Sequence, residues 1–537
     1  MSKMPQRALG GTSNVFSTSP FWGVLAVLLG GSLSTLNGRL LSVALPDVRG
    51  ALHLSVDEAA WISAAYNMAL MFIAVFSVYL GGVLGARRVL LASCAVYGFA
   101  SFLIPFAPNF NALIALQVIA GIASGTFYPL TLSFILLSLP IRIAQWGLAG
   151  YSLAILFSVN IASAAAAWYL NVLSWRWTFW CFAAFAPVMA VFVYYGIPRQ
   201  PLPKGGQASP NWRGLLYWSL GLATIFGALD QGERLHWFTS PTYAAMLAAG
   251  IFLLLVSFVR RKLDPNPLID VPFLRDRNTF LLAIILFSFR LFILASALLI
   301  PQFLAGVAGL RNEQIGQLLS IVALLQFGTA WLVAHSLRTV NSRIILAAGF
   351  LVIGLTAFLC SHITSVWTPR HFIPFAILFG VGESLAMLGL VSSIVLQVIS
   401  SGAVSGPGKV AKPFSVLTFS SFFHTVRIMG GEIATVLMIH LLSERTKFHA
   451  NVLAQGVNLN RPFVQKLLSK AMAVSGHLGR SPNPKFIGYA LGLTLRQQAS
   501  VMAYADGFTV MAWACIAVLV LIASVRLRMT TLEELQQ

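Results

Sequence analysis

Residues 36–46 read LNGRLLSVALP and close the first long apolar run of the chain, near residues 21–45. Asn37 and Arg39 interrupt this run at a depth where a membrane helix is normally hydrocarbon. An unneutralised arginine near the centre of a spanning helix costs roughly 2.5–3.5 kcal/mol, so such residues usually face a water-filled cavity. The stretch therefore predicts a membrane helix with one side turned to a polar cavity.

The composition supports a membrane protein over the whole chain. Of 537 residues, 58% are hydrophobic and only 9% are charged, which is too few charges to solvate a globular surface. The net charge of +20 does not indicate nucleic-acid binding, because the basic residues gather in short loops between apolar runs. The four cysteines lie in apolar runs without CxxC spacing, so we expect buried thiols and neither a metal site nor a disulfide framework.

Apolar segments that meet the roughly 20-residue requirement for a spanning helix recur along the sequence. The fold class predicted is an all-α membrane protein. The fourteen predicted spans lie near 21–45, 59–82, 89–106, 112–138, 144–170, 177–196, 214–230, 241–259, 279–303, 313–335, 343–362, 372–399, 414–442 and 504–525.

Lysine and arginine concentrate in alternate loops, which predicts that both termini are cytoplasmic. Two loops rich in proline, glycine and charge divide the spans into six, two and six. The predicted parts are an N-terminal segment 1–20, an N-terminal half 21–196, a linker 197–213, a two-helix insert 214–259, a linker 260–278, a C-terminal half 279–525 with an outer loop 443–503, and a tail 526–537.

Three motifs carry a resemblance to a known family. They are SVALP at 42–46 followed by Trp61, LDQGE at 229–233 followed by WFTS at 237–240, and RIMGG at 427–431. Together they resemble the fourteen-span drug:proton antiporter-2 branch of the major facilitator superfamily. The resemblance implies a major facilitator fold with alternating access between two halves, proton-linked efflux as in multidrug-resistance exporters, and a bacterial inner membrane.

The chain also departs from the branch pattern. The carboxylate that the branch carries in the first helix is Asn37 here, the branch threonine is Arg39, and its membrane arginine in the fourth helix is Gln117. In the gating loop between the second and third helices, the expected aspartate is Gly82. The other gating-loop candidates are retained, namely Gly85, Arg87 and Arg88. These departures weaken the expectation of drug:proton antiport, because proton coupling needs a titratable group.

Buried titratable residues are the candidates for coupling. Glu383 lies in the middle of GVGESLAMLG, and Glu432 follows a pair of glycines. A carboxyl group in low dielectric can carry a proton, although each could instead form a fixed pair with an embedded arginine. His424 and Arg427 share a helix face. His424 is either proton-linked or a satisfied core hydrogen bonder.

Arg39 and Arg290 lie in the helices that open the two halves, so symmetry predicts that they face one cavity. Paired guanidinium groups suit carboxylate or phosphate ligands. The alternative is that each arginine is neutralised by Glu383, Glu432 or a carbonyl group. The abundant aromatic residues, Phe127 and Tyr128 among them, indicate only membrane-interface and core positions.

These observations predict a secondary-active transporter with no catalytic residue and no metal. We expect no cofactor and take the proton gradient as the driving force. No GxxxxGK[ST] motif is present, so ATP hydrolysis is not expected. The expected partners are the lipid bilayer, a small-molecule substrate and, as a candidate, a periplasmic adaptor protein. Two alternatives stay open at this point: transport of an organic anion through Arg39 and Arg290, and a receptor or assembly platform that does not transport.

Overall fold

The computed structural model describes residues 20–138, 141–199, 212–263, 276–400, 413–456 and 484–526, together with 462, 464–466 and 469. Most of the two predicted linkers and of the terminal segments lies outside the described residues. All regular secondary structure in the described part is helical.

The first six predicted spans form the N-terminal half. Its helices are α1 (Pro20–Ala51), α2 (Val56–Leu84), α3 (Ala86–Leu103), α4 (Phe110–Ser124), α5 (Phe127–Ser138), α6 (Ile141–Trp168) and α7 (Trp177–Gly196). Short turns η1 (Ile104–Phe106) and η2 (Tyr169–Leu173) follow α3 and α6. Helices α4 and α5 together make one span, so seven helices account for six crossings.

The insert and the C-terminal half follow. The insert consists of α8 (Trp212–Gly232), η3 (Trp237–Thr239) and α9 (Pro241–Leu263). The C-terminal half consists of α11 (Arg277–Leu294), the π-turn η4 (Ala295–Leu299), α12 (Ile300–Gly306), α13 (Asn312–Ser336), α14 (Ser342–Cys360), α15 (Pro369–Ser400), α16 (Pro413–Gln455) and α18 (Pro484–Ser524). The stretch from α11 to α12 is a single span.

Local sequence explains several helix ends. Ser55 begins α2 with a capping box, in which its hydroxyl accepts from the Glu58 N–H at 3.2 Å and the Glu58 carboxylate accepts from the Ser55 N–H at 2.8 Å. Asp276 caps α11 by accepting from two backbone N–H groups. Gly85 joins α2 directly to α3 with a φ of 83°, which side chains rarely tolerate.

The described helices confirm a polytopic membrane protein. Thirteen candidate spans are long and apolar enough to cross a bilayer, and α8, with 21 residues, is long enough to be the fourteenth. Large apolar side chains point outward, for example Leu324 at 67% exposure and Trp513 at 69%. Such a surface is stable only against lipid.

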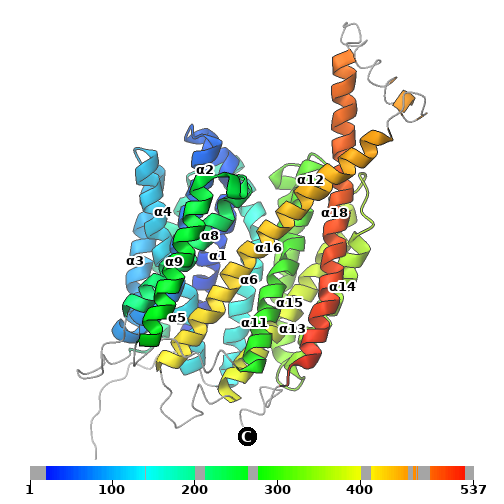
Figure 1. The fold of residues 1–537 in the computed structure, drawn as a ribbon. Coiled ribbons are helices and arrows are strands. Elements are labelled where there is room, and N and C mark those ends of the chain that lie inside the picture. The colour runs from blue at the N-terminus through cyan, green and yellow to red at the C-terminus, as the bar shows by residue number, and fades with distance from the viewer. Residues whose placement is uncertain are drawn as a thin grey trace, which may run out of the picture.

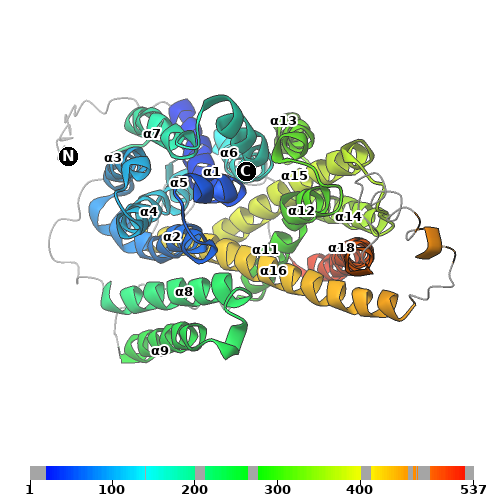
Figure 2. The same ribbon diagram turned by 90° about the horizontal axis from the view of Figure 1, so that it is seen from above.

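Figures 1 and 2 show the helices side by side, with α1–α7 in one group and α11–α18 in a second. The insert helices α8 and α9 lie outside this pair of groups, with α8 against α2 and α16. The halves meet where α6 packs on α13 and where α16 packs on α2 and α5. Helix α1 begins and α18 ends at the same face, named here the terminal face (Figure 1). That this face is cytoplasmic stays a prediction.

Helices α16 and α18 are longer than the spans predicted at 414–442 and 504–525. With 43 and 41 residues, they extend over roughly 60 Å, about twice the hydrocarbon thickness of a bilayer. Both project beyond the other helices at the face opposite the terminal face (Figure 1). Asp506 of α18 joins them by accepting from Arg445 and His449 of α16, both at 2.6 Å. The segment expected as an outer loop, 443–503, is therefore helical at both of its ends.

Candidate functional site

A layer of buried and half-buried polar side chains lies where the two halves meet. It brings together residues from α1, α5, α6, η4, α11, α13, α15 and α16. We name this set the polar layer: Thr35, Arg39, Tyr128, Asn160, Arg290, Ser296, Gln326, Glu383, His424 and Arg427.

Arg39 crosses from one half to the other. Its Nη2 donates to the carbonyl oxygen of Ala297 at 2.5 Å, and its Nε is buried without a hydrogen-bond partner. Ala297 lies in the π-turn η4, and such turns interrupt the regular α-helical hydrogen-bond ladder. Of the neutralising groups that the sequence offers for Arg39, the structure shows a hydrogen bond to a carbonyl group. No salt bridge joins Arg39 to a carboxylate among the described residues.

Glu383 is fully buried in α15 and has only neutral hydrogen-bond partners. Ser296 donates to one carboxyl oxygen at 2.7 Å, and Gln326 donates to the other at 3.4 Å. The Gln326 amide oxygen in turn accepts from Asn160 of the N-terminal half at 3.3 Å. The salt bridges among the described residues do not include Glu383. Arg290 is close enough to attract the Glu383 carboxylate, but no direct ion pair joins them in the described part of the chain. The carboxyl group can therefore gain or lose a proton without breaking such a pair.

The Arg290 side chain lies against the paired glycines of α16. A Cβ atom at position 431 would lie 2.8 Å from Nη2 of Arg290, and one at position 430 would lie 3.4 Å from its Cγ. The motif RIMGG thus leaves space for a guanidinium group between α11 and α16. Nε and Nη1 of Arg290 are buried and have no partner among the described residues. A buried cation with free donors is suited to an anion.

Arg427 and His424 reach the N-terminal half through Tyr128. The Arg427 guanidinium carbon lies 4.2 Å from the centroid of the Tyr128 ring, and the Tyr128 hydroxyl is 2.7 Å from that of Thr35. Arg427 also donates to Nδ1 of His424 at 3.2 and 3.3 Å. Because a guanidinium group only donates, Nδ1 is the acceptor, and the imidazole proton is on Nε2. That Nε2 is buried without a partner.

Three predicted site residues lie apart from the polar layer. Asn37 donates to the Tyr97 hydroxyl at 3.1 Å within the N-terminal half. Gln117 is buried in α4 with neither side-chain polar atom paired. Glu432 faces the insert, close enough to Asp230 for the two carboxylates to repel each other. The four gating-loop residues lie at the terminal face, where α2 joins α3: Gly82, Gly85, Arg87 and Arg88.

The neutral members of the polar layer are not among the residues that the sequence predicts. Asn160 and Gln326 are isolated polar residues inside apolar runs, and that pattern by itself indicates candidate site residues. Tyr128 is fully buried, as core use predicts, but its contact with the Arg427 guanidinium group is not predicted by the sequence. Its role follows from packing that no local pattern reveals.

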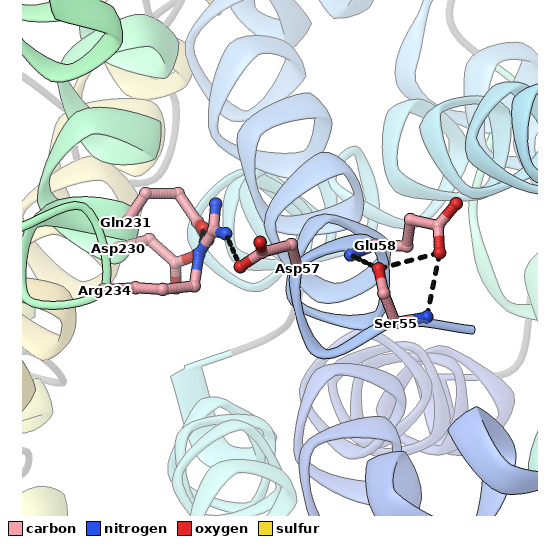
Figure 3. A network of polar contacts seen from close by, with 6 residues as sticks. All are labelled: Ser55, Asp57, Glu58, Asp230, Gln231 and Arg234. Atoms are coloured by element: carbon pink, nitrogen blue, oxygen red, sulfur yellow. Dashed lines mark hydrogen bonds and ion pairs between the residues drawn. The ribbon is translucent and has the colours of Figure 1, made fainter. Parts of the chain in front are cut away.

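The motif from Leu229 to Ser240 joins the insert to both halves at the face opposite the terminal face. Arg234 pairs with Asp57 of α2 at 2.5 Å and donates to Gln231 at 2.6 Å, and Gln231 donates to Asp230 (Figure 3). The nearby capping box of α2 is drawn in the same view. Arg234 thus joins the end of α8 that lies opposite the terminal face to the start of α2.

The same motif contacts the C-terminal half through Glu233. Its carboxylate accepts from Trp237 at 3.0 Å and lies 3.2 Å from His440 of α16. Partial burial raises the pKa of Glu233, but the hydrogen bonds from Trp237 and His440 outweigh burial, so the pKa lies below its ordinary value. A Cβ atom at Gly232 would lie 2.7 Å from the Trp237 ring, which explains the small residue there.

Two bundles of spanning helices that enclose buried polar groups define a membrane transporter of the alternating-access class. A sequence model of the Major Facilitator Superfamily matches residues 27–423. The chain belongs to this superfamily. Its members transport solutes and are not enzymes, and no group of three metal-ligating side chains comes together in the described part of the chain.

Known relatives agree with the family. The chain is 23% identical over 448 residues to the multidrug export protein EmrB of Haemophilus influenzae, which covers 82% of this chain and 84% of that protein. It is 20% identical over 396 residues to the fatty acid resistance protein FarB of Neisseria gonorrhoeae, covering 74% and 78%. Among solved structures, the proton:xylose symporter XylE gives a TM-score of 0.54 at 14% identity, covering 97% of this chain and 99% of that one.

Proposed function

We propose that this transporter exports small organic compounds across the cell membrane by alternating access, and that Glu383 carries the coupled proton. The observation that carries this proposal is the burial of Glu383 between the halves with neutral partners alone. The similarity to a multidrug export protein supports export of drug-like compounds.

Protonation of Glu383 can affect substrate access because its carboxyl group belongs to a set of hydrogen bonds that joins the two halves. In the described part of the chain, Glu383 is linked to Asn160 of the N-terminal half, both through Gln326 and by a side-chain interaction with Asn160 itself. A protonated carboxyl group can itself donate, so gain of a proton changes which hydrogen bonds this chain of amides can make. Protonation of Glu383 thereby changes the contacts that hold the two halves together, which is what coupling requires.

Cells provide the first test. Cells with and without the chain would be exposed to a panel of unrelated toxic compounds that includes decanoate and tetraphenylphosphonium. We expect growth protection against several compounds, lost when a protonophore collapses the proton gradient. Protection that survives the protonophore would refute proton coupling, and protection against none of the panel would refute multidrug export.

A second candidate concerns the charge of the substrate. Arg290 has two buried donor nitrogens without a hydrogen-bond partner and Arg39 has one, and neither forms a salt bridge with a carboxylate in the described part of the chain. An anionic group on the substrate would satisfy these donors, and the similarity to a fatty acid resistance protein is consistent with that reading.

Binding measurements separate the two candidates. Arg290→Gln and Arg39→Gln should abolish decanoate binding by the purified transporter and leave tetraphenylphosphonium binding intact. Unchanged decanoate affinity in both variants would exclude the anion site.

We also propose that the projecting ends of α16 and α18 contact a periplasmic adaptor. A cavity of about 590 Å³ lies between them, lined by residues that include Thr446, Lys447 and Arg496. The lining mixes charged and apolar side chains, and a concave surface of this kind beyond the bilayer suits a protein partner. Shortening both helices to the membrane surface should abolish growth protection in double-membraned cells and leave transport in liposomes unchanged. Equal loss in both assays would contradict this role.

A further inference from the structure

A basic pocket at the terminal face is not used by the transport site. It has a volume of about 230 Å³ and lies where α2 ends, α3 begins and α7 ends. A water molecule occupies about 30 Å³ of liquid, so several waters or one compact ligand group would fit. The lining residues are Leu84, Gly85, Arg87, Arg88, Leu91, Tyr194 and Arg199.

The charges in this pocket are all positive. The Arg87 guanidinium carbon lies 4.6 Å from the centroid of the Tyr194 ring, and Arg199 is close enough to repel Arg87. Among the described residues, Arg88 makes a single long contact of 3.5 Å, with the Leu84 carbonyl oxygen. None of the three arginines takes part in a salt bridge among the described residues.

The sequence of the N-terminal half offers no counter-charge for them. No aspartate or glutamate occurs in residues 1–46 or between residues 59 and 229. The three acidic residues that remain, Asp47, Asp57 and Glu58, lie near the end of α1 and the start of α2, at the opposite face. The linker at 197–213, which follows Tyr194, is likewise free of carboxylates. The position where the family resemblance expects an acid, residue 82, is glycine.

We propose that this pocket binds a phosphate group with a net negative charge. Guanidinium groups offer fixed forks of donors that match phosphate oxygens, and the three in this pocket have no carboxylate partner among the described residues. The pocket lies at the ends of spanning helices, at the depth of lipid headgroups. Leu84, 46% exposed, and Leu91 add an apolar edge. The phosphate comes either from an anionic lipid or from a soluble phosphate compound.

Lipid titration of the purified full-length transporter tests this proposal. The thermal unfolding midpoint would be followed in neutral detergent with added phosphatidylglycerol, phosphatidylcholine or inorganic phosphate. We expect stabilisation by phosphatidylglycerol above that by phosphatidylcholine. Arg87→Gln and Arg199→Gln should each weaken the apparent affinity about tenfold, as loss of one charge-assisted hydrogen bond does.

Arg260→Gln is the matched control. Arg260 also stacks on a tyrosine, with its guanidinium carbon 5.3 Å from the Tyr217 ring centroid, but it does not line the pocket. Arg199 is exposed, so its variant tests the site even if Arg87→Gln fails to fold. Stabilisation by phosphatidylglycerol alone identifies a lipid site, and stabilisation by inorganic phosphate as well identifies a soluble ligand. If neither stabilises the wild-type protein, or if both pocket variants respond as Arg260→Gln does, the proposal is overturned.

Discussion

In the N-terminal half, residues 59–196 contain no aspartate or glutamate, whereas the C-terminal half places Glu383 in the middle of the polar layer. The N-terminal half contributes one arginine and neutral partners such as Asn160. Two halves with a common architecture therefore differ in the chemistry that they bring to the site. The comparison teaches that only the C-terminal half of this transporter has a carboxylate in the layer that can respond to a proton gradient.

The largest effect is expected from removing that carboxylate. Glu383→Gln keeps the shape of the side chain but abolishes its titration, so proton-driven transport in liposomes should fall about 100-fold, as loss of a proton-transfer group does. Glu432→Gln is the control, because Glu432 faces the insert and not the polar layer. Equal losses in the two variants would show that the position of the carboxylate does not matter.

The next effect concerns the space that the C-terminal half leaves for Arg290. Gly431→Ala brings a Cβ atom to 2.8 Å from Nη2, and we expect overpacking to cost about 1–3 kcal/mol in a denaturant titration. Gly492→Ala in α18 meets no atom within 4 Å, so the gain in helix propensity should stabilise it by up to about 1 kcal/mol. Stabilisation of both variants would mean that Arg290 is not held against α16.

A smaller effect should follow from the contact that the N-terminal half makes with Arg427. Tyr128→Phe removes the hydroxyl that pairs with Thr35 and keeps the ring under the guanidinium group, which should cost about 1 kcal/mol. Tyr128→Leu loses the ring as well and should cost more. Thermal unfolding of the two variants measures the difference, and a Phe variant as unstable as the Leu variant would assign the contact to the hydroxyl alone.

The smallest effect should be at the insert. Because the pKa of Glu233 is depressed in the folded state, its contribution to stability is present at neutral pH and disappears as the pH falls through that folded value. The unfolding midpoints of wild type and Glu233→Gln should therefore differ at pH 7 and converge in acid. A difference that persists undiminished in strong acid would contradict the depressed pKa of Glu233.

The sequence predicted the family and the number of spans because hydropathy and motifs such as SVALP are local signals. It did not predict the length of α16 and α18. The end of α16 beyond its predicted span is polar and charged, and the apolar stretch FIGYALGLTL at 486–495 of α18 is too short to indicate a span. Hydropathy gives the depth of a residue in the membrane but not the side of the helix that it occupies.

The same limit explains the partial prediction of the site. The depth of Arg39, Arg290 and Glu383 in the membrane predicts that they belong to the site, and all three lie in the polar layer. Glu432 lies within a predicted span as well, but it faces the insert. The described residues form no direct ion pair between an embedded arginine and Glu383, although Arg290 is close enough to attract it. The Glu383 carboxyl oxygens accept from Ser296 and Gln326 instead. These partners come from helices distant in sequence, so only the packed structure reveals them.

The most direct test of proton coupling by the C-terminal half is a pair of liposome measurements on Glu383→Gln. The tracer would be a compound against which the wild-type chain protects cells. We predict that the variant still exchanges tracer across the membrane without a pH gradient but no longer accumulates it when a gradient is imposed. Accumulation by the variant that matches the wild-type protein would contradict the assignment of the proton to Glu383.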